Sequence, residues 1–252
     1  MALVGPPLAR GPRLAALPLG DASFEPMSGW LALIGGGEWR DGCSFDRTLL
    51  TASGDAGVTI LPTAAAYEHP ERAVAWAENY FEKLGGRANA LMVLARGDAE
   101  DKANAAAVRE SRFIYLSGGS PMHLRSVLKD SMVWNALVAA WSDGAVLAGS
   151  SAGAMVLCDP MVDPRGGAFT LGLGLVAQVA VIPHHDTWSP EKARRTITLA
   201  PRHLPVVAID EQTALLRDPA GGWSVQGAGQ VVVFQNGAEA GLGALPGPTA
   251  GG

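Results

Sequence analysis

The sequence predicts an α/β fold in which a mostly parallel β-sheet is covered by helices on both faces, giving three layers. Short apolar runs, several of them closed by glycines or a proline, alternate with segments that favour helices. Runs of this kind form strands buried on both faces, as in parallel sheets built from βαβ units. After about residue 168 the pattern changes to short strands separated by turns. We therefore expect added antiparallel strands at one end of the sheet.

The expected elements follow from apolar runs, from helical patterning and from turn residues. Strands of the parallel part are expected at residues 31–34, 57–61, 91–94, 113–116 and 145–149. Helices are expected at residues 70–84, 101–107, 122–128 and 133–141. In the later part, strands are expected at 179–182, 206–209, 214–216, 223–226 and 231–234, with one helix at about 190–199.

Three segments make up the expected domain organisation. Residues 1–28 are rich in proline without a helical period and are expected to form an N-terminal extension. Residues 29–240 are expected to form a single α/β catalytic domain. Residues 241–252 are rich in Gly, Pro and Ala and are expected to form a flexible tail.

Composition excludes several classes of protein. The chain has 252 residues, 48% of them hydrophobic, and a formal net charge of -5. This composition excludes a wholly disordered chain, and the acidic balance argues against nucleic-acid binding. No apolar run approaches the roughly 18 residues that span a bilayer. Cys43 and Cys158 stand far apart without zinc or disulfide spacing, so we expect reduced thiols, a cytoplasmic protein, and neither metal nor cofactor.

The segment Gly149–Gly153 carries the strongest functional signal. It reads G-S-S-A-G, follows an apolar strand and precedes a helix-compatible run over 152–157. In this context G-x-S-x-G forms a nucleophile elbow, which lifts the Ser151 hydroxyl above the carboxyl edge of the sheet. The Ala152 amide is then a natural oxyanion donor, and Gly119, at the end of another expected strand, is a second. A small-residue turn that only packs strand on helix is the alternative.

A serine nucleophile needs a base and an acid that orients the base. Of the five histidines, His184 and His185 follow an expected strand end, and the residues alone do not choose between them. Several carboxylates are candidates for the orienting acid, and the residues do not choose among them either. They are Asp159, Asp163, Asp186 and the pair Asp210–Glu211.

Together these motifs resemble the serine peptidase family of cyanophycinase and the aspartyl dipeptidase called dipeptidase E. The matching segments, in order, are Gly118–Gly119, G-S-S-A-G-A from Gly149, G-L-G-L from Gly172, Pro183–His184, and I-D-E-Q-T-A-L from Ile209. The resemblance covers about residues 30–234. It implies a class I glutamine amidotransferase-like, flavodoxin-like fold in which serine replaces the cysteine nucleophile.

The resemblance also assigns roles. It implies Ser151 as nucleophile, His184 as catalytic histidine, and Gly119 and Ala152 as oxyanion donors. The dipeptidase has its acid shortly after the serine, where Gly166 stands here, and Asp163 is the nearest acid. Positions that correspond to substrate-binding regions of the family are Ser120, His185, Arg194 and Arg195.

The expected function is hydrolysis of a short peptide or isopeptide bond, with Asp at the scissile bond implied by the resemblance alone. Two alternatives remain open: an amidase or acyl transferase acting on a small amide, and a non-catalytic binding module on the same fold. We expect no nucleic-acid or membrane partner. A homodimer is compatible with the sequence, since closed two-fold dimers are the commonest oligomers.

Overall fold

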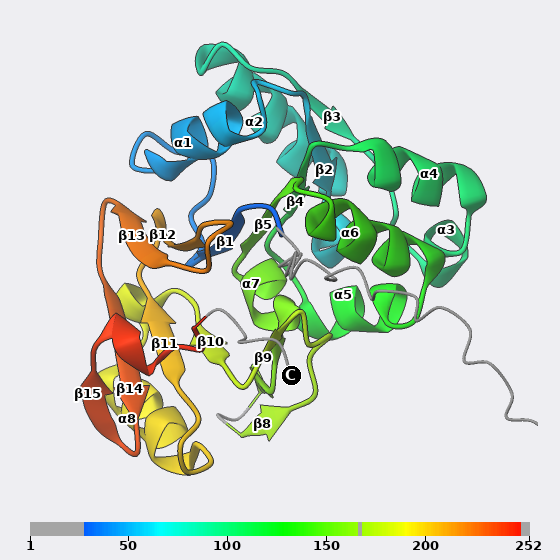
Figure 1. Ribbon diagram of the computed structural model, residues 1–252. Helices are drawn as coiled ribbons and strands as arrows, with labels where there is room; N and C mark the ends of the chain where they lie inside the picture. The colour runs from blue at the N-terminus through cyan, green and yellow to red at the C-terminus, as the bar shows by residue number, and fades with distance from the viewer. Residues whose placement is uncertain (1–27, 166–167, 248–252) are drawn as a thin grey trace, which may run out of the picture.

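The computed structural model describes residues 28–165 and 168–247 (Figure 1). Its centre is a seven-stranded sheet in the order β13-β12-β1-β5-β4-β2-β3. Strands β1, β5, β4, β2 and β3 are parallel, and β12 and β13 add antiparallel strands beyond β1. The strands are β1 (Leu31–Ile34), β2 (Val58–Leu61), β3 (Ala88–Ala90), β4 (Phe113–Leu116), β5 (Val146–Ser150), β12 (Thr213–Arg217) and β13 (Trp223–Gly227).

Helices cover both faces of this sheet, which confirms the three-layer fold (Figure 1). Alternate residues of β1 belong to different cores: Ala32 and Ile34 pack toward α1 and α2, and Leu31 and Leu33 face the other side. The period of two along a strand produces this division. The helices are α1 (Phe45–Ala52), α2 (Pro70–Lys83), α3 (Arg96–Ala99), α4 (Lys102–Glu110), α5 (Pro121–Leu128), α6 (Met132–Ser142) and α7 (Ala152–Leu157).

The core beneath α1 and α2 contains a set of packed aromatic residues that we call the aromatic cluster. Its members are Trp39, Tyr80, Phe81, Phe113 and Tyr115. Their ring centroids lie 5.3 to 6.3 Å apart, the spacing of favourable tilted and edge-to-face pairs.

The later strands were expected to extend one end of the main sheet, and this is only partly what the structure shows. Strands β12 and β13 do join it, but the others form a second sheet in the order β10-β11-β14-β15. Strands β10 and β11 are parallel, because α8 connects them as a crossover. These elements are β10 (Ala180–Ile182), α8 (Pro190–Leu199), β11 (Val206–Ile209), β14 (Val231–Gln235) and β15 (Ala238–Ala240).

Short elements complete the described chain. Two small sheets lie between α7 and β10, pairing β6 with β9 and β7 with β8. Their bounds are β6 (Cys158–Asp159), β7 (Met161–Val162), β8 (Phe169–Thr170) and β9 (Val176–Ala177). Single-turn helices are η1 (Thr63–Ala65), η2 (His185–Thr187) and η3 (Leu242–Ala244).

The third parallel strand lies earlier than its apolar residues suggested. The expected strand at 91–94 is wrong, because the paired residues are Ala88–Ala90. The Asp98 carboxylate accepts hydrogen bonds from the Leu94 and Ala95 amides, both at 2.9 Å. These side-chain contacts satisfy the backbone and turn the chain away from the sheet toward α3.

The chain ends lie largely beyond the described residues. The predicted N-terminal extension falls outside them except for residue 28, and residues 248–252 of the predicted tail do as well. Residues 241–247 are described and contact both sheets: η3 packs against β14, Leu245 is buried, and the indole of Trp223 in β13 donates to the Pro246 carbonyl at 2.9 Å. None of the helices in the described ranges combines the length and apolar character needed to cross a membrane.

Candidate active site

The turn between β5 and α7 has the geometry of a nucleophile elbow. Ser151 adopts φ +47°, a strained value for a residue with a side chain. The glycines on either side permit the close approach of strand and helix. A Cβ at Gly149 would lie 2.7 Å from the Gly153 carbonyl carbon, and one at Gly153 would lie 2.7 Å from the Leu116 carbonyl oxygen. Ser151 donates its amide hydrogen to the Ile34 carbonyl at 2.9 Å, which fixes the elbow to β1.

His184 contacts the Ser151 hydroxyl directly. The His184 Nε2 atom lies 2.8 Å from Ser151 Oγ. The histidine stands at the end of β10, and its amide donates to the Gly35 carbonyl at 2.7 Å. Its ring packs on Gly36, where a Cβ would lie 2.2 Å from Cε1. A glycine at φ +112° is therefore required at position 36 for the imidazole to reach the serine.

Glu211 holds the other side of the imidazole. Its Oε1 atom lies 2.8 Å from His184 Nδ1. An ionised carboxylate only accepts, so Nδ1 carries the hydrogen and Nε2 is left to accept from the serine hydroxyl. The Glu211 amide donates to Asp186 Oδ1 at 3.0 Å, which joins the loop after β11 to the loop after β10.

The acid assigned from the resemblance occupies a different place. Asp163 pairs with Arg165, whose hydrogen bonds lower the pKa of the Asp163 carboxyl to about 2. The structure therefore does not bring Asp163 to His184, and Glu211 stands in that position instead. The sequence signal for Glu211 was its place directly after an apolar strand, which left it one candidate among several.

The two expected oxyanion donors belong to two different turns, one directly after the serine and one after β4. Ala152 begins α7, and amides of the first helical turn have no acceptor within the helix. Gly119 has φ +133°, and a Cβ there would lie 2.4 Å from the Ala64 carbonyl oxygen. The neighbouring Gly118 is close to the nucleophile, since a Cβ on it would lie 3.5 Å from Ser151 Cβ.

Glu38 is a site residue that sequence reasoning missed. It follows the glycine turn after β1, and its carboxylate accepts from the Gly118 amide at 2.9 Å and from the Ser150 hydroxyl at 2.7 Å. An acidic residue after a glycine-rich turn at a strand end was the available signal. The chain pattern does not show that such a side chain reaches across two neighbouring strands.

The four positions expected to bind substrate have different surroundings. Ser120 caps α5, accepting from the His123 amide at 3.3 Å. His185 Nδ1 lies 3.5 Å from Asp210 Oδ1, beside the His184–Glu211 pair. Arg194 and Arg195 are exposed on α8.

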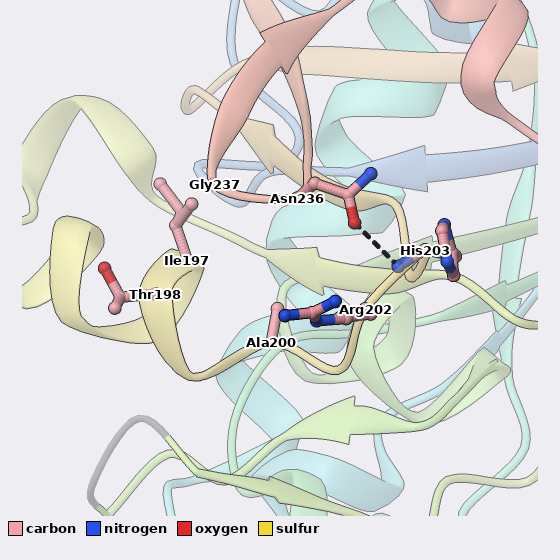
Figure 2. A pocket seen from close by; sticks show the side chains of 7 residues that line it. All are labelled: Ile197, Thr198, Ala200, Arg202, His203, Asn236 and Gly237. Carbon is pink, nitrogen blue, oxygen red and sulfur yellow. Dashed lines mark hydrogen bonds between the residues drawn. The ribbon is translucent and has the colours of Figure 1, made fainter.

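A separate hollow of about 560 Å³ lies at the end of α8 and the turn between β14 and β15 (Figure 2). Arg202, His203 and Asn236 line it, and the Asn236 side-chain oxygen accepts from the His203 amide at 3.1 Å. None of its lining residues belongs to the Ser151 site. Within the described ranges, no three His, Cys, Asp or Glu side chains are grouped so that they could hold a metal ion.

Comparison with known sequences identifies the family of this chain. Residues 31–221 match the sequence profile of peptidase family S51. The chain belongs to peptidase family S51. A cyanophycinase from Synechococcus elongatus is 27% identical to this S51 chain over 241 residues, covering 89% of it and 74% of the relative. A cyanophycinase from Trichormus variabilis is 28% identical over 218 residues, covering 80% and 72%.

Solved structures with a similar fold include proteins described as peptidases. A crystal structure of a peptidase from an acI-B1 Actinobacterium is 30% identical with a TM-score of 0.75, covering 84% of this chain and 93% of that one. A putative peptidase E protein from Listeria monocytogenes has a TM-score of 0.59 at 19% identity, covering 82% and 98%, and shares the fold. The resemblance and the fold class expected from the sequence are both confirmed.

Proposed function

We propose that this S51 peptidase hydrolyses a peptide or isopeptide bond through an acyl intermediate on Ser151. One observation carries the proposal: His184 makes a 2.8 Å contact with the Ser151 hydroxyl and another with the Glu211 carboxylate. The three residues follow the ends of β5, β10 and β11, which are far apart in the sequence, so no local sequence preference explains why they meet. A nucleophile, a base and an orienting acid in this order are the components of serine catalysis.

The first half-reaction is acylation. Ser151 Oγ attacks the scissile carbonyl carbon while His184 Nε2 takes the hydroxyl proton. Glu211 accepts from Nδ1 and stabilises the imidazolium that forms. The carbonyl oxygen becomes an oxyanion between the Gly119 and Ala152 amides. Their N–H groups already point at the developing charge and stabilise it without reorganising. His184 then gives its proton to the leaving amine as the carbon–nitrogen bond breaks.

The second half-reaction is deacylation. A water molecule enters the space left by the amine and gives a proton to His184 Nε2. The resulting hydroxide attacks the acyl carbon, and the same two amides again face the oxyanion. Collapse releases the carboxylic acid, and the proton returns from His184 to Ser151 Oγ.

The substrate class that we propose is a short peptide or isopeptide with an Asp residue at the scissile bond. Support comes from the relatives named cyanophycinase and from the family resemblance of the site motifs. An amide-to-amine acyl transfer differs only in which nucleophile attacks the acyl-serine, so product analysis distinguishes the two reactions.

The decisive experiment is fluorophosphonate labelling of the wild-type protein and of Ser151→Ala, with the adduct located by mass spectrometry. We expect an adduct on Ser151 in the wild type and no labelling of the variant. Ser126→Ala is the matched control, because it removes an exposed hydroxyl on α5 that bonds only the His123 carbonyl and leaves the Ser151 elbow unchanged. An unlabelled wild-type protein across mildly acidic to mildly basic pH would contradict the proposal.

A substrate panel then tests the bond. Aspartyl dipeptides and β-aspartyl-arginine polymers are incubated with wild-type protein and with Ser151→Ala, with and without an added amine. We expect free amino acids or dipeptides from the wild type only. A new amide formed with the added amine would indicate an acyl transferase instead.

A further inference from the structure

Glu38 is unusual among the acidic residues of the site because its two carboxylate oxygens bind two different parts of the catalytic framework. Oε1 accepts from the Gly118 amide at 2.9 Å, and Oε2 accepts from the Ser150 hydroxyl at 2.7 Å. Gly118 precedes Gly119, a proposed oxyanion donor, and Ser150 precedes the nucleophile. One side chain therefore joins the two segments that the reaction needs on either side of the scissile carbonyl.

The sheet order explains how one residue reaches both segments. Strands β1, β5 and β4 are neighbours, so their carboxyl ends lie side by side. Gly36 and Gly37 have φ of +112° and +61°, and this turn directs the chain back over the sheet edge. Glu38 then extends from the end of β1 across β5 to the turn after β4. A Cβ at Gly118 would lie 3.0 Å from Glu38 Oε1, so the carboxylate is in direct contact with that backbone.

The direction of the Gly119 amide depends on the peptide that precedes it. The Gly118–Gly119 turn has no side chains of its own to pack, and glycine backbones have large conformational freedom. One side of the turn is fixed where Ser120 donates its amide hydrogen to the Ala64 carbonyl at 2.8 Å. The other side is fixed by Glu38 through the Gly118 amide.

We infer that Glu38 is a positioning residue for the oxyanion hole, holding the Gly118–Gly119 turn at a fixed distance from the nucleophile elbow. This inference rests on the proposed function. Donors must stand within a few tenths of an ångström of the developing oxyanion to stabilise it, and small misplacements are costly. The role is geometric: Glu38 accepts from backbone and hydroxyl groups and leaves the proton transfer to His184 and Glu211.

The variants Glu38→Ala and Glu38→Gln separate geometry from charge. A glutamine keeps an oxygen that accepts from the Gly118 amide, and its NH₂ group donates to the Ser150 oxygen once that hydroxyl rotates. We expect kcat of Glu38→Ala to fall on the order of 100-fold with KM within a few-fold of wild type. Glu38→Gln should recover most of the lost kcat. Rates of fluorophosphonate labelling at Ser151 should follow the same order.

Hydrogen exchange gives a readout that does not depend on activity. The peptide covering residues 117–121 contains the Gly118 amide, which loses its acceptor in Glu38→Ala. We expect faster deuterium uptake there in Glu38→Ala than in wild type or Glu38→Gln, at unchanged uptake in β4. Ser150→Ala removes only the elbow half of the contact and should lower kcat less than Glu38→Ala.

The outcomes distinguish this inference from the proposed function. Equal kcat, labelling rate and exchange in wild type and Glu38→Ala would overturn the positioning role and leave the acyl-Ser151 mechanism intact. Equal losses in Glu38→Gln and Glu38→Ala would also overturn it, because the charge and not the geometry would then matter. A wild-type protein without labelling or hydrolysis would overturn both.

Discussion

Two of the acidic residues in the loop after β1 and its continuation into α1, Glu38 and Asp46, have opposite surroundings. Glu38 lies at the carboxyl edge of the sheet, where both of its oxygens accept hydrogen bonds. Asp46 lies fully buried beside the aromatic cluster, and neither of its oxygens has a hydrogen-bond partner within the described residues. Burial raises the pKa of the Asp46 carboxyl well above its ordinary value.

The difference shows what each environment does to a carboxyl group. At the sheet edge, a backbone amide and a hydroxyl replace the water that the Glu38 carboxylate loses, and the carboxylate holds these two groups in place. Beside the aromatic cluster only the uncharged acid is tolerated, because an isolated buried charge is very costly. Substitutions at the edge should therefore change catalysis, and substitution of Asp46 should change the pH dependence of stability.

The largest expected effect is that of Glu211→Gln at the sheet edge. The glutamine carries no charge to stabilise the imidazolium, and where its NH₂ group faces Nδ1 it donates and leaves the imidazole in the wrong tautomer for accepting the serine proton. By analogy with loss of the orienting acid in other serine peptidases, kcat should fall by about 10⁴-fold. Steady-state hydrolysis measures the change, and a thermal melt should show nearly unchanged stability.

Asp163→Asn is the matched control for that experiment. It makes the same change of acid to amide at the acid nearest to the position that the family resemblance implies. Because Asp163 pairs with Arg165 and does not reach His184, its kcat should equal that of wild type. A large loss in Asp163→Asn with none in Glu211→Gln would reverse the assignment of the orienting acid.

A second and smaller effect is expected from Gly36→Ala. The added methyl group would lie 2.2 Å from His184 Cε1, and φ +112° is unfavourable for alanine. The imidazole must shift, and kcat should fall on the order of 100-fold through misplacement alone. Gly54→Ala is a suitable control, since it also has positive φ but a Cβ there meets no atom within 4 Å. Gly54→Ala should lose stability without losing kcat.

The sequence predicted those parts of the site that depend on one chain segment. Ser151 and Ala152 were proposed because strand, glycine elbow and helix are contiguous, and His184 was proposed because the resemblance placed it after G-L-G-L; the structure brings His184 to Ser151. Glu211 and Glu38 reach their partners across strands, which a single sequence without its sheet order cannot show. Helix α8 was predicted at about residues 190–199, which are its observed bounds.

The errors in the fold have the same origin. The apolar residues 91–94 looked like a strand, yet the partners available in three dimensions favour Ala88–Ala90, and Asp98 takes the following amides. The later strands were predicted as strands, but their division between two sheets depends on the α8 crossover. Local pattern determines whether a strand forms, and long-range packing determines which sheet it joins.

Asp46→Asn should remove a pH dependence of stability. The folded-state pKa of Asp46 is raised, so its contribution is fully present below the unfolded pKa of about 3.9 and is lost as pH rises above it. The wild-type free energy of unfolding should therefore fall by up to about 1.4 kcal/mol per pH unit relative to Asp46→Asn. Denaturant unfolding from pH 4 to pH 8 measures this. If the unfolding free energies of the two proteins changed with pH in parallel, Asp46 would not be held uncharged in the folded state.

The smallest expected effect is on the stability of the control variant Asp163→Asn. Its change with pH runs in the opposite direction to that expected for Asp46→Asn. Arg165 lowers the pKa of Asp163 to about 2, so this carboxylate contributes stability above its unfolded pKa that is lost as pH falls from about 4 through 2. Because the partner Arg165 is largely exposed, the contribution should stay below about 1 kcal/mol. Asp163→Asn should thus be slightly less stable than wild type at pH 7 and equal to it below pH 2.

Asp46→Asn should gain stability over wild type as pH rises, so the difference in unfolding free energy between Asp46→Asn and Asp163→Asn should grow with pH. A common slope would mean that contact with Arg165 and burial beside the aromatic cluster do not set the charge of the two carboxyl groups.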